Sequence, residues 1–479
     1  MITTTHEDIT FSPAGTVRNY RSTVRWKGDT YIQIDNPRGS NWVREAVYTP
    51  PTPPISIPNV GLGNSVFVST EGKTVAAGAI RESITDHFSN INEAVTAAQF
   101  GDTIYVYGGT HIATGNLHKD GVNWHFFGEP IISANPGVTL FNNLGVSTNL
   151  VIKGDAHFVN AFYTGGPNAR IFGFTGVANT IDITCKSITL AGSEGIIFTN
   201  VTGKLTVTKE IRKTSSDYLF RLFQDTTVIV TTPLLISTNF NVTNFDSLIS
   251  TESDYIGSSI FNVDLMTKTV NRFSCIRIQG GGKLTFNGKI DFYTGTTGLY
   301  VSVFWVNTGV ASTLEVNGDV NSNVHAYNIF SGANQTFTHK GGTILTNAAT
   351  TTLFPLNNAG QTNTTFNLSG IYQDNGAATT HINMTGTGAV LNVNGAQIIK
   401  NTSNAGGTRG LDVSGTSVVL LNNSKIVMDT AFGPAESIYA SGPKDIKILQ
   451  GGAGSNVAAN GNITNIITGT TLIVDTDFQ

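Results

Sequence analysis

The sequence predicts an all-β fold, a right-handed parallel β-helix, and two observations carry this prediction. Only 13% of the 479 residues are charged, about half the share in an average soluble domain, and Gly, Thr, Asn and Ser take their place. These residues suit turns and the solvent-facing positions of strands, and they form helices poorly. The second observation is a strand-and-turn unit that recurs about every 20 to 30 residues, a period typical of a solenoid.

The first 60 residues are expected to lie outside this solenoid. Residues 1–49 indicate a small β domain, with two or three short strands around Trp26, Tyr31 and Trp42. These rings suit a sugar-binding platform, but a small domain needs such rings as its core, and the core is the favoured interpretation. Residues 50–60, which include PPTPPISIP, are expected to form an extended linker. Proline fixes its own φ and restricts the residue before it.

The β-helix is expected to cover residues 61–454 and to carry one helix near its N-terminal end, at residues 89–98. The apolar residues of that helix fall on one face, at Ile91, Ala94, Val95 and Ala98. Asn90, with Glu93 three residues later, resembles a capping box. The sequence therefore predicts a helix with one apolar face and a capping residue at Asn90.

Two strands are predicted directly after this helix. In GDTIYVYGGTH, alternation sends Ile104 and Val106 to one face and Tyr105 and Tyr107 to the other. The second strand lies in LHKDGVNWHFFG and is entered through an Asp-Gly turn. Both strands are expected to belong to the first coils of the solenoid.

Residues 90–111, NINEAVTAAQFGDTIYVYGGTH, and 116–126, NLHKDGVNWHF, resemble the opening region of pectin-lyase-like β-helix proteins, among them phage tailspikes and tail fibres. The resemblance is strong over residues 69–135 and extends further only through the repeat pattern. It implies a capping helix followed by a parallel β-helix. It does not imply a chemistry, because the same opening segment precedes enzymes and inert fibres alike.

From residue 283 onward the repeat is clearest, as in KLTFNGKI and TLEVNGDV. The first apolar residues of successive copies are expected to stack in one internal column, 23 to 30 residues apart: Leu284, Leu314, Phe337, Phe366, Leu391 and Val419. The second turn residue is usually Gly, and Asn423 at this position is expected to adopt a positive φ. Copies in the N-terminal half are assigned to segments starting at Leu150, Phe172 and Ile188.

A coil of this length holds three short strands, so stacked coils form parallel sheets around a continuous core. On the outside, Asn and Thr at equivalent positions are expected to form hydrogen-bonded ladders. An array of β-sandwiches is the alternative fold, because it too gives short strands with turn signals. It explains less well why one unit recurs with the same Gly or Asn position.

Charge and cysteine content limit the function classes. The net charge is −4 and there is no long basic run, which argues against nucleic-acid binding. Cys185 and Cys275 have no metal-ligand spacing and are expected to be buried free thiols, and neither a metal site nor a cofactor is expected. No apolar stretch is long enough for a membrane span, and the N-terminal residues lack the pattern of a secretory signal.

Three groups of residues are candidates for chemistry or binding. The carboxylates of segment 245–264 are Asp246, Glu252, Asp254 and Asp264; they suggest a pair for glycoside hydrolysis, although a solvated loop is the favoured interpretation. Arg212, Lys213 and Asp217 suggest lyase chemistry, but they lack acidic residues with calcium-site spacing, so surface charge is favoured. These residues alone do not indicate an enzyme.

The third candidate is an aromatic sugar-binding surface formed by Tyr300 and Tyr327. Alternation places Tyr300 on the outer face and Trp305 on the valine side, which indicates the core for the tryptophan. For Tyr300 and Tyr327, core packing and an exposed sugar contact remain equally open.

The order of segments resembles that of a phage receptor-binding protein: a small N-terminal domain, a proline-rich linker and then a β-helix. The resemblance implies a homotrimer on the virion surface, attached to other virion proteins through its N-terminal region and binding a host surface polysaccharide without catalysis. A tailspike depolymerase and a bacterial adhesin are the alternatives. Residues 455–479 are expected to cover the open end of the last coil and to lie partly against a neighbouring chain.

Overall fold

The structure is a computed structural model, and it describes the chain in segments. These are residues 3–10, 18–26, 29–36, 39–44, 65–73, 87–143, 145, 147–160, 170–191, 195–214, 218–238, 247–270, 274–295, 301–331, 333–347, 354–356, 363–376, 380–384, 388–401, 408–414, 418–422, 424–428, 435–441, 447–450, 457–459 and 462–464. The chain divides into two compact units, residues 1–62 and 63–479.

The first unit contains a four-stranded antiparallel sheet in the order β1-β2-β3-β4. Its strands are β1 (Thr3–Thr10), β2 (Arg18–Trp26), β3 (Asp29–Asn36) and β4 (Gly39–Arg44). Trp26, Tyr31 and Trp42 lie in β2, β3 and β4. The packing of their rings and the proline-rich segment 50–60 lie outside what the structure describes.

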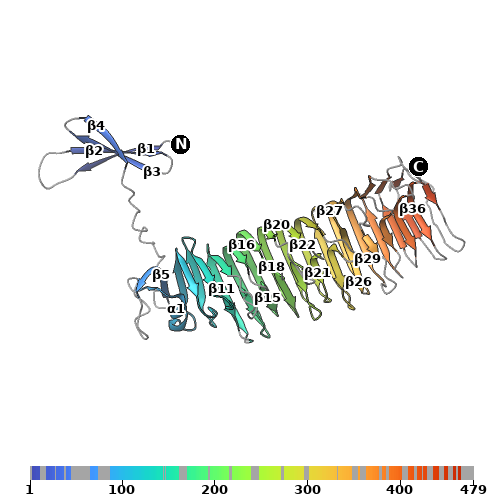
Figure 1. The fold of residues 1–479 in the computed structure, drawn as a ribbon, viewed down its shortest axis with the longest axis horizontal. Coiled ribbons are helices and arrows are strands. Elements are labelled where there is room, and N and C mark those ends of the chain that lie inside the picture. Colours follow the sequence, from blue (N-terminus) through green and yellow to red (C-terminus); the bar gives the residue numbers. More distant parts are fainter. Residues whose placement is uncertain are drawn as a thin grey trace. The chain divides into compact units, whose positions relative to one another are not determined.

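The second unit is a parallel β-solenoid, as predicted, with three sheets (Figure 1). The 22-stranded sheet contains β5 (Ser65–Lys73), β6 (Thr103–Tyr107), β7 (Thr110–Ala113), β8 (Asn123–Phe127), β9 (Ile131–Ala134), β11 (Thr148–Gly154), β12 (His157–Asn160), β14 (Asn179–Leu190), β16 (Val201–Lys213), β18 (Thr227–Ser237), β20 (Ser258–Val270), β22 (Lys283–Thr294), β24 (Thr313–Asn317), β25 (Val320–Ser322), β27 (Thr336–Thr346), β29 (Thr365–Asp374), β31 (Val390–Asn394), β32 (Gln397–Lys400), β34 (Val418–Asn422), β35 (Ser424–Met428), β37 (Lys447–Gln450) and β38 (Val457–Ala459).

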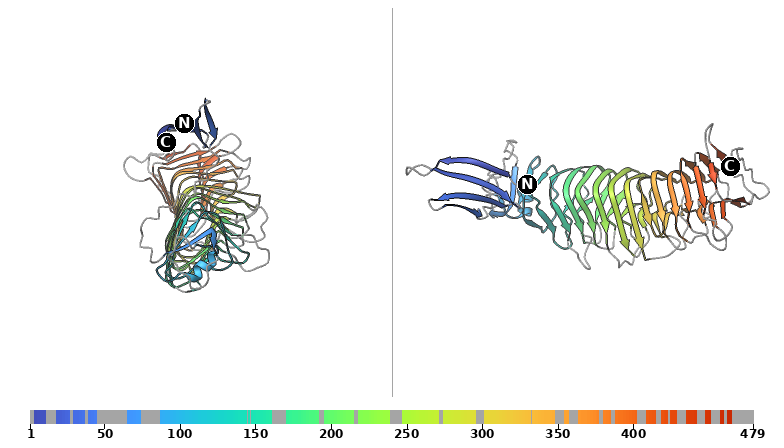
Figure 2. Two further views of the ribbon diagram at one scale, coloured as in Figure 1. Left: turned by 90° about the vertical axis from the view of Figure 1, so that its left-hand side faces the viewer. Right: turned by 90° about the horizontal axis from the view of Figure 1, so that it is seen from above.

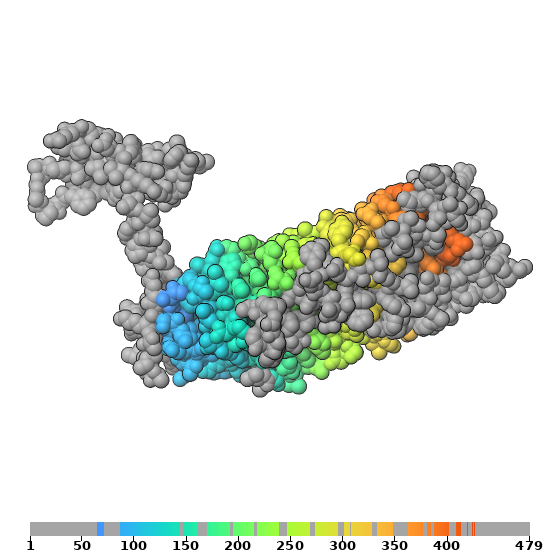
Figure 3. Space-filling view, viewed as in Figure 1, coloured from blue at the N-terminus to red at the C-terminus, as the bar shows by residue number. Residues whose placement is uncertain are grey.

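The two smaller sheets follow one another along the chain. The eight-stranded sheet contains β10 (Phe141–Asn142), β13 (Phe172–Phe174), β15 (Ile196–Thr199), β17 (Phe220–Phe223), β19 (Ile249–Thr251), β21 (Ser274–Ile278), β23 (Ser302–Asn307) and β26 (His325–Ser331). The five-stranded sheet contains β28 (Phe354–Leu356), β30 (Thr380–Met384), β33 (Thr408–Ser414), β36 (Ala435–Ser441) and β39 (Asn462–Thr464). Figures 2 and 3 show successive coils as successive bands along this unit.

The predicted internal column is confirmed along its whole length. Each of its six residues is the register partner of the next: Leu284, Leu314, Phe337, Phe366, Leu391 and Val419. All six are at most 1% exposed. Their side chains alternate with polar residues that face outward, so each coil adds one apolar layer to a continuous core.

The copies assigned in the N-terminal half are wrong. Leu150 pairs with Ile181 in the 22-stranded sheet, whereas Phe172 pairs with Phe141 and Ile196 in the eight-stranded sheet. Ile188 lies in the second half of β14, where it pairs with Phe158. The three segments look alike because every face of the solenoid buries a short alternating strand. They are therefore different faces of the coils and not successive copies of one face.

The predicted turn glycines form bends within strands. Gly288 and Gly318 have φ values of 127° and 135°, and Gly288 lies inside the continuous strand β22. A Cβ on Gly288 would come within 1.5 Å of the carbonyl oxygen of Val263 on the previous coil. Glycine is therefore required both by the backbone conformation and by the close stacking of coils. Asn423 lies outside the described residues.

The helix α1 (Ile91–Ala97) is present close to its predicted position. The side chain of Asn90 accepts a hydrogen bond from the backbone N–H of Asn92 at 2.9 Å. This bond satisfies one of the free donors in the first turn. Ile91 and Ala94 are buried, and the helix contacts β5 and β7. The predicted apolar face is therefore the face that packs against the strands.

Polar ladders run along the outside, as predicted. Asn317 donates from Nδ2 to Oδ1 of Asn287, which donates in turn to Asn262, each at 2.7 Å. Further along, Asn392 donates to Asn367 at 2.8 Å, and Asn367 donates to Thr338 at 3.1 Å. Uncharged amides thus satisfy one another between coils, which explains how the surface carries so little charge.

Both cysteines are buried free thiols, as predicted. Burial raises the pKa of Cys185 far above its ordinary range and that of Cys275 to about 12. A thiol is a nucleophile only as its thiolate, so neither cysteine is a reactive group.

Candidate functional site

The outer face of the eight-stranded sheet carries a column of polar and aromatic residues. Arg221, Ser250, Arg277 and Trp305 are register partners on β17, β19, β21 and β23. The residues that precede them in the sequence form the buried inner column: Phe220, Ile249, Ile276 and Phe304. Because side chains alternate across a strand, the core residues fix the outward direction of this column.

An ion pair holds the first part of this face together. Arg221 Nε lies 2.9 Å from Glu252 Oε1, and Ser250 Oγ donates to the same oxygen at 3.2 Å. The two charged side chains are 24% and 14% exposed. The guanidinium of Arg221 also lies over the rings of Tyr218 and Phe223, at 5.2 and 5.0 Å from their centroids. Glu252 and the two rings therefore fix the position of Arg221.

The second arginine connects the two aromatic residues of the face. Arg277 donates from Nη1 to the hydroxyl of Tyr218, and its guanidinium lies 4.7 Å from the ring centroid of Trp305. Burial raises the pKa of the Tyr218 hydroxyl, so it stays protonated at neutral pH. We call Tyr218, Arg221, Glu252, Arg277 and Trp305 the arginine–aromatic cluster. With two arginines and one glutamate it carries one positive charge in excess.

This cluster is suited to binding rather than to acid–base chemistry. A guanidinium binds a carboxylate or phosphate through two parallel hydrogen bonds, and aromatic rings contact the apolar faces of sugars. Glycoside hydrolysis needs two carboxyl groups at about 5 to 9.5 Å, and the cluster contains one, which an arginine already neutralises. The arrangement therefore fits a polar ligand with a negative group.

Of the predicted carboxylates, only Glu252 lies in this cluster. Asp254 is exposed in the turn after β19, and Asp264 is exposed on β20 of the 22-stranded sheet. Asp246 lies outside the described residues. The structure therefore places the described carboxylates on different elements, and it does not present them as one site.

The structure describes two of the aromatic residues considered in the sequence. Tyr327 is 1% exposed, and its ring lies 4.7 Å from that of Phe337 and 5.3 Å from that of Phe366. It belongs to the core, because β26 turns this position inward, and it cannot contact a glycan. Trp305 is 5% exposed and is buried, as predicted, but its ring lies under Arg277 and outside the main hydrophobic cluster. Tyr300 lies outside the described residues.

The residues considered for lyase chemistry are also placed differently from the prediction. Lys213 is fully buried at the end of β16 and is not a surface charge. Arg212 points the other way and forms an ion pair with Glu210 at 3.0 Å. Asp217 lies outside the described residues. The difference follows from alternation, which turns neighbouring residues of one strand to opposite faces.

Sequence reasoning missed both arginines of the cluster and a second polar group inside the solenoid, formed by Asp374, His381 and Lys400. The sequence does contain a pattern that indicates the arginines, because FRLF and SCIRI each place one charged residue among alternating core residues. Joining them into one site required the coil register, which loops of different length obscure.

Within the part of the chain that the structure describes, no three His, Cys, Asp or Glu side chains gather in a group that could hold a metal ion. Among the described residues no helix is long and apolar enough to cross a membrane. No family model, curated protein or solved structure matches the sequence.

Proposed function

We propose that this chain is a phage virion fibre or spike that binds a glycan on the host surface and does not cleave it. The parallel solenoid supports the proposal, because such a stack offers a long, polar and weakly charged surface with loops on its faces. The opening segment at residues 90–126, with its resemblance to tailspikes and tail fibres, supports it as well. Receptor binding and host attachment are then the role of the second unit.

Further details belong to the same proposal. The solenoid is a right-handed parallel β-helix of the pectin-lyase-like type, and α1 covers its N-terminal end. The sheet β1–β4 is a small domain that attaches the protein to other virion proteins. The protein is a homotrimer on the surface of the extracellular particle, in a tail fibre or tailspike.

The arginine–aromatic cluster is the proposed glycan contact, and Arg277 carries the argument. Glu252 neutralises Arg221 through the 2.9 Å ion pair, whereas the described partners of Arg277 are a neutral hydroxyl and a ring. A planar guanidinium held over an indole ring fits the carboxylate of an acidic sugar. The proposed ligand is therefore an anionic polysaccharide of the host surface.

Replacing Arg277 by Ala is expected to weaken binding of a host acidic polysaccharide about tenfold or more, because one charge-assisted contact is lost. Calorimetry with purified host polysaccharide measures this change. Arg212→Ala is the control, since Arg212 is an arginine on a strand of another sheet, where it forms an ion pair with Glu210. Equal affinity of wild type and Arg277→Ala would exclude the arginine–aromatic cluster as the glycan contact. A wild-type protein that binds no host glycan would exclude the proposed function itself.

The depolymerase alternative rests on Glu252, a carboxylate held in the cluster at 14% exposure. Incubation of the protein with the same polysaccharide, followed by assays for new reducing ends and unsaturated products, distinguishes the two functions. The binding proposal predicts neither product. If the wild type produces new reducing ends and Glu252→Gln does not, the protein is a hydrolase and the binding proposal is wrong.

A further inference from the structure

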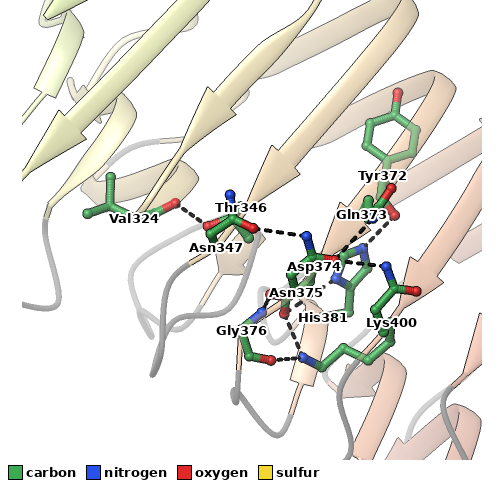
Figure 4. Close-up of polar contacts among 11 residues, drawn as sticks. Val324, Thr346, Asn347, Tyr372, Gln373, Asp374, Asn375, Gly376, His381 and Lys400 are labelled. Carbon is green, nitrogen blue, oxygen red and sulfur yellow. Dashed lines mark hydrogen bonds and ion pairs between the residues drawn. The ribbon is translucent and has the colours of Figure 1, made fainter.

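Asp374, His381 and Lys400 form a fully buried ionisable group in the C-terminal part of the solenoid (Figure 4). Asp374 is the last residue of β29 and Lys400 the last of β32, and the two are register partners on neighbouring coils. His381 lies on β30, in the five-stranded sheet. The side chains of all three are 0% exposed.

The contacts inside this group are specific. Lys400 Nζ lies 3.0 Å from Asp374 Oδ2 and also donates to the backbone carbonyl of Gly376. The other carboxylate oxygen, Oδ1, accepts a hydrogen bond from the backbone N–H of Gly376 at 2.7 Å. His381 Nδ1 lies 3.7 Å from Asp374 Oδ2. One carboxyl group thus faces an amine, a backbone donor and an imidazole.

The protonation of the imidazole follows from its second contact. His381 Nε2 lies 3.0 Å from the backbone carbonyl oxygen of Tyr372, which can only accept a hydrogen bond. Nε2 therefore carries a proton, and in the neutral ring Nδ1 is an acceptor that faces Asp374. His381 can accordingly take up a proton at the carboxyl group and release it again.

A condensation between the two side chains requires the neutral amine and the neutral carboxyl group. Separate charges are expensive in an apolar interior, and moving one proton from Lys400 to Asp374 gives a neutral amine and a neutral acid with no change in net charge. A neutral amine is a nucleophile, and a protonated carboxyl group has water as its leaving group. The register pairing holds the two groups together without the entropy loss of an encounter.

We propose that Lys400 and Asp374 condense to an amide that cross-links two neighbouring coils. Lys400 Nζ attacks Asp374 Cγ, and the N–H of Gly376 stabilises the negative charge that develops on Oδ1. His381 Nδ1 takes a proton from Nζ and gives it to Oδ2, which leaves as water. One C–N bond forms, one C–O bond breaks and one water is released, so no oxidant or further reactant is needed.

The cross-link would close a loop between residues 26 positions apart. Such a closure limits the freedom of the unfolded chain and lets neighbouring coils open only together. In a solenoid each coil contacts only its neighbours, so a covalent bond between coils blocks fraying from the C-terminal end. The bond would give an extracellular rod mechanical strength without a disulfide.

The mass of the full-length chain under denaturing conditions tests the proposal. We expect it to be about 18 Da below the sequence mass, the loss of one water. Tandem mass spectrometry of a digest should then find the peptides of Asp374 and Lys400 joined. A chain at its full sequence mass overturns the proposal, and so does a deficit located in a linear peptide.

Single substitutions test which residues form the amide bond. Lys400→Met should remove the deficit, whereas Lys268→Met should keep it. Lys268 is the matched control because it is buried at the same ladder position, but its Nζ donates to the carbonyl of Ser274 at 2.7 Å. His381→Phe should slow the appearance of the deficit in freshly purified protein, and an unchanged rate would exclude His381 as the proton carrier. The wild-type measurement remains decisive even where a variant fails to fold.

Discussion

Glu315 shows how a single outward position couples three coils. Lys340 Nζ lies 2.8 Å from its Oε1 and Lys283 Nζ 3.1 Å from its Oε2, and Asn317 also donates to it. The hydrogen bond from Lys340 is the largest cause that lowers the pKa of Glu315 from 4.5 to about 2. Its carboxylate is 15% exposed, whereas the lysines are about half exposed, so solvent screens part of this interaction.

The lowered pKa of Glu315 predicts a pH dependence of stability. A carboxyl group with a depressed pKa stabilises the folded state above pH 4.5, and this contribution is lost as the pH falls from 4.5 towards 2. Glu315→Gln should therefore lower the free energy of unfolding by about 1 kcal/mol at neutral pH and by less at pH 2. Urea denaturation at several pH values measures this difference. An equal effect of the substitution at pH 7 and pH 2 would contradict the assignment.

A residue of the site could be predicted from the sequence only where the pattern that identifies it lies within one short segment. Glu252 was a candidate from the sequence because acidic residues are sparse in this chain and segment 245–264 contains four of them. Arg221 and Arg277, by contrast, meet only through the pairing of β17, β19 and β21. The inward position of Tyr327 depends on the register of β26, and an alternating pattern alone does not say which of its two faces is buried.

At the scale of the element, the column from Leu284 to Val419 was predictable because each copy combines alternation with a fixed glycine or asparagine. The glycine marks the bend, so it aligns strands whose loops differ in length. In the N-terminal half this marker is shared by strands of different faces, as Leu150 and Phe172 show. The pattern there identifies strands correctly but cannot say which sheet each joins.

A substitution of Phe337 tests how much the internal column contributes to stability. The ring of Phe337 is fully buried, and its centroid lies 4.7 Å from that of Tyr327 and 6.0 Å from that of Phe366. Phe337→Ala should cost about 3 to 5 kcal/mol of stability, because the stacked coils cannot close the cavity. Ile229→Ala, at a residue 44% exposed, should cost far less. Denaturant midpoints measure both, and similar losses in the two variants would disprove the layered core.

At the scale of the whole molecule, the end of the solenoid is the feature that requires an explanation. Residues 457–459 and 462–464 form β38 and β39, which continue the parallel pairing onto β35 and β36 of the same chain. Part of the predicted assembly segment 455–479 therefore extends the last coil. Residues 465–479 of that segment lie outside the described residues. Among the described strands β39 is the edge of its sheet, and an edge strand offers backbone donors and acceptors for pairing.

This edge, together with the tailspike-like order of segments, predicts that residues 455–479 contribute to a homotrimer. Three chains that cover one another's last coils would pair these backbone groups and prevent growth into open filaments. Native mass spectrometry of the full-length protein should show a trimer, and deletion of residues 455–479 should give monomers or aggregates. Deletion of residues 1–49 is the control, because it leaves the last coil intact and should preserve the trimer. A full-length chain that stays monomeric and soluble at high concentration would show that the last coil needs no partner.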